Sequence, residues 1–421
     1  FSLPAKAHIL SLFLFPVSTN YVMKMINCFI PFLSLPQARQ TVRALGLCDR
    51  IKNIYLLATE KIPDEVEGCE MLMIDSPAST ATFRTIALHA DTAYTLLYTK
   101  YTAFEPGQFA FERLLAIAGD TNAGMLYADR YLLKNGNSQQ APVIDYQKGS
   151  LRDDFDFGSL LFFRSSVLKQ AVRAMDADYR FAGLYDLRLR VSELAELVHV
   201  NEYLYSEVET DIRKSGEKLF DYVDPKNRAV QIEMEAVCTA YLKRVGGYLA
   251  PDFEPVTFDA GGFEQEASVI IPVRNRIRTI EDAIRSVLAQ KTTFRFNLII
   301  VDNHSTDGTS EAIGKYTADG RVVLLVRERS DLGIGGCWNV GVHHPACGKF
   351  AVQLDSDDVY SGPDTLQKIV DAFYEQNCAM VVGTYRMTDF KMNEIPPGII
   401  DHREWTLENG RNNALRINGL G

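Results

Sequence analysis

The sequence shows no excess of positive charge. Its 421 residues include 54 acidic and 44 basic side chains, which give a net charge of −10 at pH 7. The lysines and arginines also form no continuous basic stripe. Proteins that bind nucleic acid usually present such a stripe to the phosphate backbone. The composition therefore argues against a nucleic-acid partner.

Long apolar runs are absent as well. The N-terminal stretch from Ile9 to Phe15 is apolar, but it ends at Pro16, and a membrane-spanning helix needs about 20 such residues. Because Lys6 precedes this stretch, a signal peptide remains an alternative. We expect residues 1–22 to form an apolar N-terminal extension that precedes the folded domain.

Cysteines are few, and their spacing matches neither a disulfide framework nor a metal site. Their odd number and wide separation favour a reducing cytoplasm over secretion. An association with the inner face of a membrane stays open. The seven cysteines are Cys28, Cys48, Cys69, Cys238, Cys337, Cys347 and Cys378.

Strand-like and helix-like segments alternate through the C-terminal part of the chain. Continuous apolar runs predict strands, and apolar stripes at helical spacing, such as Ile280, Ile284 and Val287, predict helices. This alternation predicts a mostly parallel, twisted α/β sheet. The predicted strands are 268–272, 296–301, 322–326, 350–354 and 379–383, and the predicted helices are 280–288, 311–316, 338–343 and 366–373.

The acidic cluster Asp355-Ser356-Asp357-Asp358 directly follows the predicted strand 350–354. Carboxylates crowded at the end of a buried strand repel one another. A hard divalent cation such as Mg²⁺ or Mn²⁺ would neutralise them, since it prefers oxygen ligands. The alternative is a solvated turn that precedes the helix starting near Ser361.

Two further polar clusters stand at predicted strand ends. Pro272 to Asn275 follow the first strand, and Asp302 to Asp307 follow the second. In open α/β sheets, ligands bind beyond the carboxyl ends of the strands. We therefore expect all three clusters to meet in one crevice.

Three segments, in this order and spacing, resemble glycosyltransferase family 2. They are Val269-Ile270-Ile271-Pro272-Val273-Arg274-Asn275, Ile300-Val301-Asp302-Asn303-His304-Ser305-Thr306-Asp307-Gly308 and Leu354-Asp355-Ser356-Asp357-Asp358. The resemblance covers about residues 266–421. It implies the GT-A fold, a nucleotide-sugar donor and a divalent metal, Mn²⁺ or Mg²⁺.

The resemblance also implies the roles of individual residues. Asp355 and Asp357 would be catalytic, and Asp355, Asp357 and Asp358 would hold the metal. An inverting transfer also needs a carboxylate base for the acceptor hydroxyl, and this base is expected beyond Gly421. The residues that would bind the nucleotide sugar are Pro272, Val273, Asn275, Asp302, Asn303, Ser305, Asp307, Asn339, Asp355 and Ser356.

The glycine-rich segment and the histidines nearby are given structural roles. Gly333-Ile334-Gly335-Gly336 does not complete a dinucleotide-binding fingerprint, because Trp338 stands where a third glycine is needed. We expect these glycines to give flexibility at a helix entry. His304, His343 and His344 could ligate a metal, but surface or hydrogen-bonded positions are expected for them.

The first half of the chain also contains a series of strand-like and helix-like segments, and this series resembles a second, diverged GT-A domain. We expect this domain over residues 23–250, followed by a linker at 251–265. The segment Thr99-Lys100-Tyr101 ends a predicted strand where the family has aspartates. Gly183-Leu184 aligns with the catalytic acidic pair of the family. We expect this domain to lack the metal and base motifs, although Lys100 could supply a positive charge in place of a metal.

The separation of Thr99 from Gly183 leads us to expect that the second domain is C-terminally incomplete. The same separation, measured from Asp355, places the catalytic base beyond Gly421. The carboxylates that could substitute for it, Glu394, Asp401 and Glu404, do not match the expected position.

These features predict a metal-dependent, inverting glycosyltransferase of polysaccharide or glycan synthesis. The donor of first choice is UDP-linked, and the acceptor is a saccharide or a lipid-linked saccharide. One alternative is a non-catalytic, two-domain protein that either binds nucleotide sugars or serves as a scaffold. Another is an aspartate-nucleophile phosphohydrolase, but three strand–helix units precede the acidic cluster, whereas that class carries its motif on the first strand.

Overall fold

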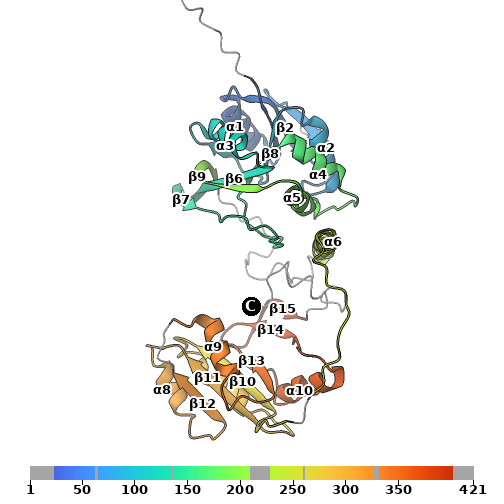
Figure 1. Ribbon diagram of the computed structural model, residues 1–421. Helices are drawn as coiled ribbons and strands as arrows, with labels where there is room; N and C mark the ends of the chain where they lie inside the picture. Colours follow the sequence, from blue (N-terminus) through green and yellow to red (C-terminus); the bar gives the residue numbers. More distant parts are fainter. Residues whose placement is uncertain are drawn as a thin grey trace, which may run out of the picture. The chain divides into compact units, whose positions relative to one another are not determined.

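The computed structural model describes residues 23–61, 65–134, 136–208, 228–258, 261–326 and 331–401. The chain divides into two compact units. The first unit comprises the chain up to Pro251 together with the residues from Met387 onward, and the second unit comprises Asp252–Arg386 (Figure 1). The predicted extension at 1–22 lies outside the described residues.

The second unit is built on four parallel strands in the order β12-β11-β10-β13. The predicted α/β class is confirmed. The strands are β10 (Ala267–Val273), β11 (Phe296–Asp302), β12 (Val322–Val326) and β13 (Phe350–Gln353). The helices are α7 (Ile280–Leu288), α8 (Thr309–Gly314), α9 (Gly333–Val342) and α10 (Thr365–Gln376).

Helices cover both faces of this sheet, which explains why its strands are continuous apolar runs rather than alternating ones. Successive side chains of a strand point to opposite faces. Val269 and Ile271 belong to the core that α7, α8 and α10 cover. Ile270, between them, packs with Cys337 of α9 on the other face.

Two sequence predictions in the C-terminal part of the chain are wrong. Residues 379–383 form no strand; instead, β14 (Tyr385–Thr388) pairs with β15 (Glu394–Ile400). Met380 and Val382 are largely exposed, because their segment has no strand beside it in the sheet. The helix predicted from Trp338 begins earlier, at Gly333, so the glycine-rich segment is its first turn.

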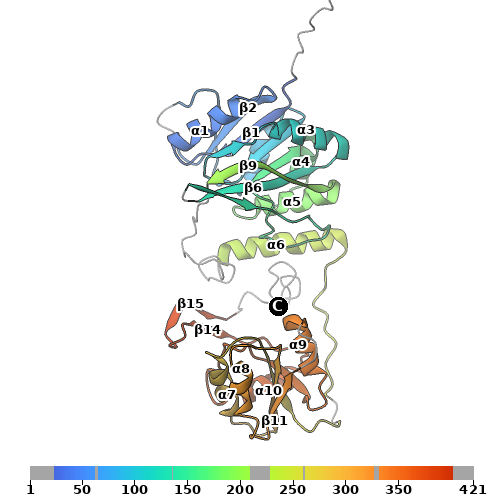
Figure 2. The ribbon, with the colours of Figure 1, turned by 90° about the vertical axis from the view of Figure 1, so that its left-hand side faces the viewer.

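The first unit contains a larger, mixed sheet in the order β3-β2-β1-β4-β8-β6-β9-β5, with β7 paired to β6. Figure 2 labels β1, β2, β6 and β9 of this sheet. Strands β3, β2, β1 and β4 are parallel neighbours. Strand β8 runs antiparallel to both β4 and β6, and β6 and β9 are parallel. The strands are β1 (Ile26–Pro31), β2 (Ile51–Ala58), β3 (Glu70–Met73), β4 (Tyr94–Tyr98), β5 (Phe104–Pro106), β6 (Met125–Lys134), β7 (Asn137–Ala141), β8 (Leu160–Arg164) and β9 (Leu197–Val208).

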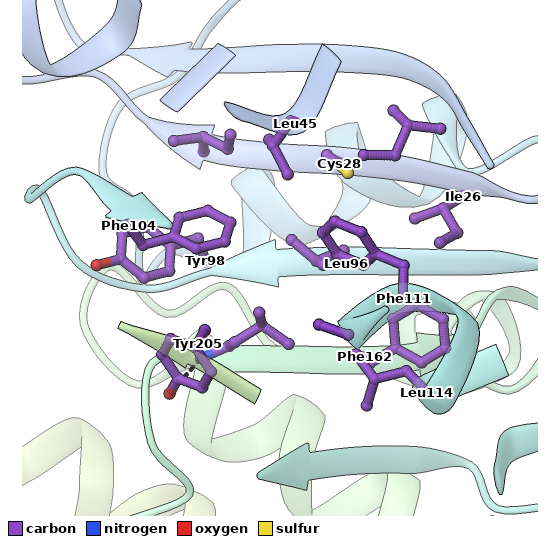
Figure 3. Close-up of a cluster of buried hydrophobic side chains, with 14 of the residues drawn as sticks. Ile26, Cys28, Leu45, Leu96, Tyr98, Phe104, Phe111, Leu114, Phe162 and Tyr205 are labelled. Atoms are coloured by element: carbon purple, nitrogen blue, oxygen red, sulfur yellow. Dashed lines mark hydrogen bonds between the residues drawn. The ribbon is translucent and has the colours of Figure 1, made fainter. Parts of the chain in front are cut away.

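Helices cover both faces of this sheet as well. One core contains Cys28 of β1, Leu96 of β4 and Phe111 of α3 (Figure 3). Helices α2, α4 and α5 pack on the opposite face, and α6 packs against α5 through residues such as Tyr241. The helices are α1 (Leu35–Gly46), α2 (Thr80–His89), α3 (Ala110–Thr121), α4 (Ser165–Arg173), α5 (Gly183–Leu194) and α6 (Arg228–Val245).

The two units share a pattern of strands. In the first unit, the run β3-β2-β1-β4 places the third, second, first and fourth strands side by side. The run β12-β11-β10-β13 of the second unit has the same order and the same parallel sense. The end of β4 in the first unit therefore corresponds to the end of β13 in the second.

All seven cysteines are free thiols. Within the described ranges, no helix has the length and apolar character needed to cross a membrane.

Candidate functional site

The polar clusters predicted at strand ends meet at one edge of the second sheet. Val273 of β10 lies opposite Asp302 of β11 in the parallel register. On the other side of β10, Ile270 lies opposite Gln353 of β13, and the Leu354 amide donates a hydrogen bond to the Ile270 carbonyl oxygen (3.2 Å). The carboxyl ends of β10, β11 and β13 therefore lie at the same edge of the sheet.

The loop after β10 is held against the loop after β11 by side chains of the second loop. Three successive amides of the β10–α7 loop donate hydrogen bonds to them. The pairs are Asn275 N–Ser305 Oγ (2.9 Å), Arg276 N–Thr309 Oγ1 (2.8 Å) and Ile277 N–Asp307 Oδ2 (3.1 Å). These bonds give both loops a defined backbone.

Asn275 adds a hydrogen bond in which the second loop donates and the first loop accepts. Its Oδ1 accepts a hydrogen bond from the Thr306 amide (2.8 Å), and its backbone is left-handed, with φ 54°. Asparagine tolerates this conformation better than most residues. Asn275, Ser305 and Asp307, which the sequence assigns to nucleotide binding, thus share their polar atoms between the two loops.

Asp302 is 1 % exposed, and the loop that follows it surrounds its carboxylate. Its Oδ1 accepts hydrogen bonds from the Ser305 amide (3.0 Å) and the Ser305 hydroxyl (2.7 Å), and its Oδ2 accepts one from the Ser310 hydroxyl. Each carboxylate oxygen has two acceptor positions. Among the described residues, no second donor reaches Oδ2, so one acceptor position on this oxygen is open there.

Other residues predicted at this edge contribute mainly through the backbone. Pro272 and Val273 are buried, and the Val273 carbonyl accepts a hydrogen bond from the Asn303 amide (2.9 Å). The side-chain oxygen of Asn303 and Nε2 of His304 are buried and have no hydrogen-bond partner among the described residues. His304 therefore departs from the expectation of a surface or hydrogen-bonded histidine.

Asn339 is exposed on α9, the helix that packs on β10 and β11. Its carbonyl oxygen lies 2.9 Å from Nδ1 of His343. His344 Nδ1 accepts a hydrogen bond from the Ala346 amide (3.2 Å). His343 and His344 thus fit the structural role that the sequence predicts for them.

The acidic cluster forms a tight turn beyond β13. The Asp358 amide donates a hydrogen bond to the Asp355 carbonyl oxygen (3.1 Å). Ser356 is buried, whereas Asp355, Asp357 and Asp358 reach solvent. Partial loss of hydration raises the pKa of Asp358 above its ordinary value, and the charges of Asp355 and Asp357 raise it further. A cation would relieve this repulsion.

Arg276 is a residue of this site that sequence reasoning missed. Its Nε lies 3.7 Å from Oδ2 of Asp357, and the two side chains are 50 % and 46 % exposed. Its position directly after Asn275, in a segment that also holds Arg274 and Arg278, was the feature that could have drawn attention to it.

The residues of the acidic cluster fit a metal ion whose coordination is completed by the substrate. Across the described ranges, no group of three or more His, Cys, Asp or Glu side chains is arranged to hold a metal ion. Mg²⁺, however, is usually bound by one or two carboxylates together with substrate phosphates. Asp355 and Asp357, which are exposed at the turn, could supply those carboxylates.

The corresponding position in the first unit has different chemistry. Lys100, just beyond β4, lies 2.6 Å from the buried carboxylate of Glu207, which also accepts a hydrogen bond from Arg130 (3.0 Å) and one from Ser159. The charge of Lys100 is therefore offset within the protein.

The expected base position of the first unit is also closed. Gly183 begins α5, and a Cβ atom there would lie 2.5 Å from the Thr80 nitrogen and 2.6 Å from the Ala78 carbonyl oxygen. A carboxylate side chain cannot fit at Gly183 without displacing this backbone.

Residues 268–419 match the family model described as Glycosyl transferase family 2. This segment is therefore similar to that family, and the resemblance predicted from the three motifs is confirmed. The match begins one residue after the start of β10 and includes the acidic cluster.

Several relatives are similar to part of this chain. The putative teichuronic acid biosynthesis glycosyltransferase TuaG of Bacillus subtilis is 32% identical over 120 residues, which cover 28% of this chain and 46% of TuaG. An uncharacterised glycosyltransferase of Rickettsia conorii is 38% identical over 97 residues, which cover 23% of this chain and 15% of the relative. The chain thus spans less than half of the length of either relative.

Solved structures are similar at a lower level. The 1–349 segment of TarS of S. aureus, in complex with UDP-GlcNAc, has a TM-score of 0.36 and 9% identity, covering 53% of this chain and 73% of that segment. The mannosyltransferase PcManGT of Pyrobaculum calidifontis, in complex with GDP-Man and Mn²⁺, has a TM-score of 0.26 and 21% identity, covering 40% of this chain and 47% of that protein.

Proposed function

We propose that the second unit binds a nucleotide-sugar donor with a divalent metal and transfers the sugar to a saccharide or lipid-linked acceptor, with inversion, in polysaccharide or glycan synthesis. The observation that carries this proposal is the meeting of Asp302 with Asp355 and Asp357 at one edge of a parallel sheet. The match of residues 268–419 to the model of glycosyltransferase family 2 supports it, as does the similarity to TuaG.

The chemistry of each cluster suits one part of such a donor. Asp302 has, on a buried carboxylate, one acceptor position that no described residue fills, which suits a ribose hydroxyl or a base amide. Asp355 and Asp357 would hold Mn²⁺ or Mg²⁺, which stabilises the negative charge that grows on the diphosphate leaving group. Asp358 lies beside them and adds negative charge to the metal position.

The carboxylate base that inversion requires is not assigned to a described residue. Glu394 opens β15 and Asp401 follows that strand. Glu404 lies outside the described residues.

We take UDP as the nucleotide of first choice.

Calorimetry with the full chain tests the proposal. UDP and GDP are each titrated with Mn²⁺ and with EDTA. We expect UDP to bind measurably with Mn²⁺ and far more weakly with EDTA. If neither nucleotide binds with Mn²⁺, the proposed function is wrong, and if only GDP binds, the choice of nucleotide is wrong.

The phosphohydrolase alternative is not favoured by the fold. The acidic cluster follows β13, which is the fourth strand of its unit along the chain. The scaffold alternative remains open for the chain as a whole, and the same titration bears on it, because a scaffold that binds no donor gives no signal.

A further inference from the structure

Arg276 connects the two loops of the nucleotide-binding edge to the acidic cluster. Its guanidinium is the positive group that the structure places beside Asp357, with Nε 3.7 Å from Oδ2. The pair joins the β10–α7 loop to the turn beyond β13. It therefore places a cation where the proposed metal would lie.

The backbone of Arg276 is fixed, whereas its head group is not. The Arg276 amide donates a hydrogen bond to the buried hydroxyl of Thr309 (2.8 Å). Among the described residues, the guanidinium makes one hydrogen bond, from Nη1 to the carbonyl oxygen of Asn275 (3.2 Å). The side chain can thus change direction while its starting point stays beside the site.

The contact with Asp357 is of a kind that exchanges easily. Both side chains are about half exposed, and Nε lies at 3.7 Å rather than at hydrogen-bond distance. Exposed ion pairs of this geometry contribute little to stability. A divalent cation bound to Asp357 would repel the guanidinium and release it.

A diphosphate would then offer the guanidinium a better partner. The planar fork of arginine matches phosphate oxygens with two parallel hydrogen bonds. The β10–α7 loop that carries Arg276 borders the position of the donor in the proposed function, on which this inference rests. The released side chain therefore lies within reach of the leaving group.

We propose that Arg276 is a positioning residue that exchanges partners during donor binding. Without metal, it neutralises Asp357. When a divalent cation occupies the acidic cluster, Arg276 leaves Asp357 and binds the diphosphate of the nucleotide. Arg276 thus opposes metal binding on its own and favours nucleotide binding once the metal is present.

Two measurements on Arg276→Gln test this exchange, because they should change in opposite directions. Free Mn²⁺, followed by electron paramagnetic resonance without nucleotide, should bind about threefold more tightly, since the competing cation is removed. UDP at saturating Mn²⁺, followed by calorimetry, should bind about tenfold more weakly, since a charge-assisted hydrogen bond is lost. Arg276→Lys, which keeps the charge without the fork, should fall between Arg276→Gln and the wild type in both measurements.

Arg295→Gln is the matched control. Arg295 is exposed and directly precedes β11, at the edge of the sheet opposite to the site, so neither affinity should change. A loss of folding in Arg276→Gln would weaken both affinities together, and equal urea midpoints exclude it.

The outcomes separate this inference from the proposed function. Wild-type protein that binds no UDP with Mn²⁺ overturns both. Wild-type binding with affinities unchanged in Arg276→Gln, or changed in the same direction, overturns the partner exchange and leaves the proposed function standing.

Discussion

At the scale of single residues, the site contains two kinds of carboxylate. Asp302 is buried and largely satisfied by the hydroxyl groups of Ser305 and Ser310. Asp355 and Asp357 are exposed at a turn. A carboxylate of the first kind has a fixed direction and can select a ligand, whereas carboxylates of the second kind are available to a metal.

Thr309 links the rigid part of the site to a titratable group. Its buried hydroxyl accepts a hydrogen bond from the Arg276 amide (2.8 Å) and donates one to Oδ1 of Asp307 (2.5 Å). The hydroxyl of Thr309 is the largest cause that lowers the pKa of Asp307 below 3.8. The removal of this hydroxyl should therefore affect both stability and its dependence on pH.

We predict that Thr309→Val destabilises the second unit by about 0.5–1.5 kcal/mol at pH 7, because the Arg276 amide loses its acceptor. The pKa of Asp307 is lowered by folding, so its contribution to stability is present above the unfolded value near 3.8 and is lost as the pH falls through the lower folded value. Thr309→Val keeps less of this contribution, because the hydroxyl that lowers the pKa of Asp307 is gone. The difference from the wild type should therefore be larger at pH 7 than at pH 2.5 in urea unfolding.

Thr317→Val is the control for this experiment. Thr317 is exposed, and its hydroxyl donates to a backbone carbonyl, that of Gly314, rather than to a carboxylate (2.9 Å). Its effect should be small and independent of pH. If the Thr309→Val difference were also the same at both pH values, Asp307 would play no part in the effect.

The sequence predicts strand-end residues well, and it does not predict the contacts between their side chains. Asp302 and Asp355 stand at the ends of apolar runs that alternate with helical segments, and this alternation favours strands and a place at the sheet edge. Arg276 contacts Asp357 only because β10 and β13 are neighbours in the sheet. The pairing of β10 with β13 is a tertiary feature, and the sequence around either residue does not indicate it.

At the scale of elements, α9 shows how packing overrides local preference. Glycine is a poor helix former, so the sequence predicts a loop at Gly333 and a helix from Trp338. The structure begins the helix at Gly333. Close packing against β10 explains a glycine further along the helix, because a Cβ atom at Gly341 would lie 2.5 Å from Cγ2 of Ile270.

We predict that Gly341→Ala destabilises the second unit by about 1–3 kcal/mol, since an added methyl group in a packed core forces the helix away from the sheet. Ile270 is fully buried and β-branched, so it cannot move aside easily. The urea midpoint of unfolding measures the effect.

Gly335→Ala in the same helix is the matched control. A Cβ atom there meets nothing within 4 Å, so the change should be neutral or should stabilise the protein by up to about 1 kcal/mol through helix propensity. Equal effects of the two substitutions would contradict the close contact between α9 and β10.

At 379–383 the local sequence favours a strand, but the structure forms none. An apolar segment becomes a strand only when a neighbouring strand satisfies its backbone. Met380 and Val382 lie outside any sheet in the structure, and pairing begins two residues after Gly383, in β14. Composition alone cannot distinguish these two situations.

At the scale of the whole molecule, two units share the strand order 3-2-1-4 and differ in what stands at the end of the fourth strand. In the second unit, the fourth strand leads to Asp355 and Asp357. In the first unit, it leads to Lys100, whose charge Glu207 offsets. The account therefore places metal-dependent donor binding in the second unit alone.

The most direct measurement of this claim is the calorimetric titration of UDP with Mn²⁺ into the full chain carrying Asp357→Ala. Glu375→Ala removes an exposed carboxylate of α10 in the same unit and serves as the control. We predict one UDP bound per chain in the wild type and in Glu375→Ala, and no Mn²⁺-dependent binding in Asp357→Ala. An unchanged UDP–Mn²⁺ affinity in Asp357→Ala, or a second UDP bound per chain, would contradict the account.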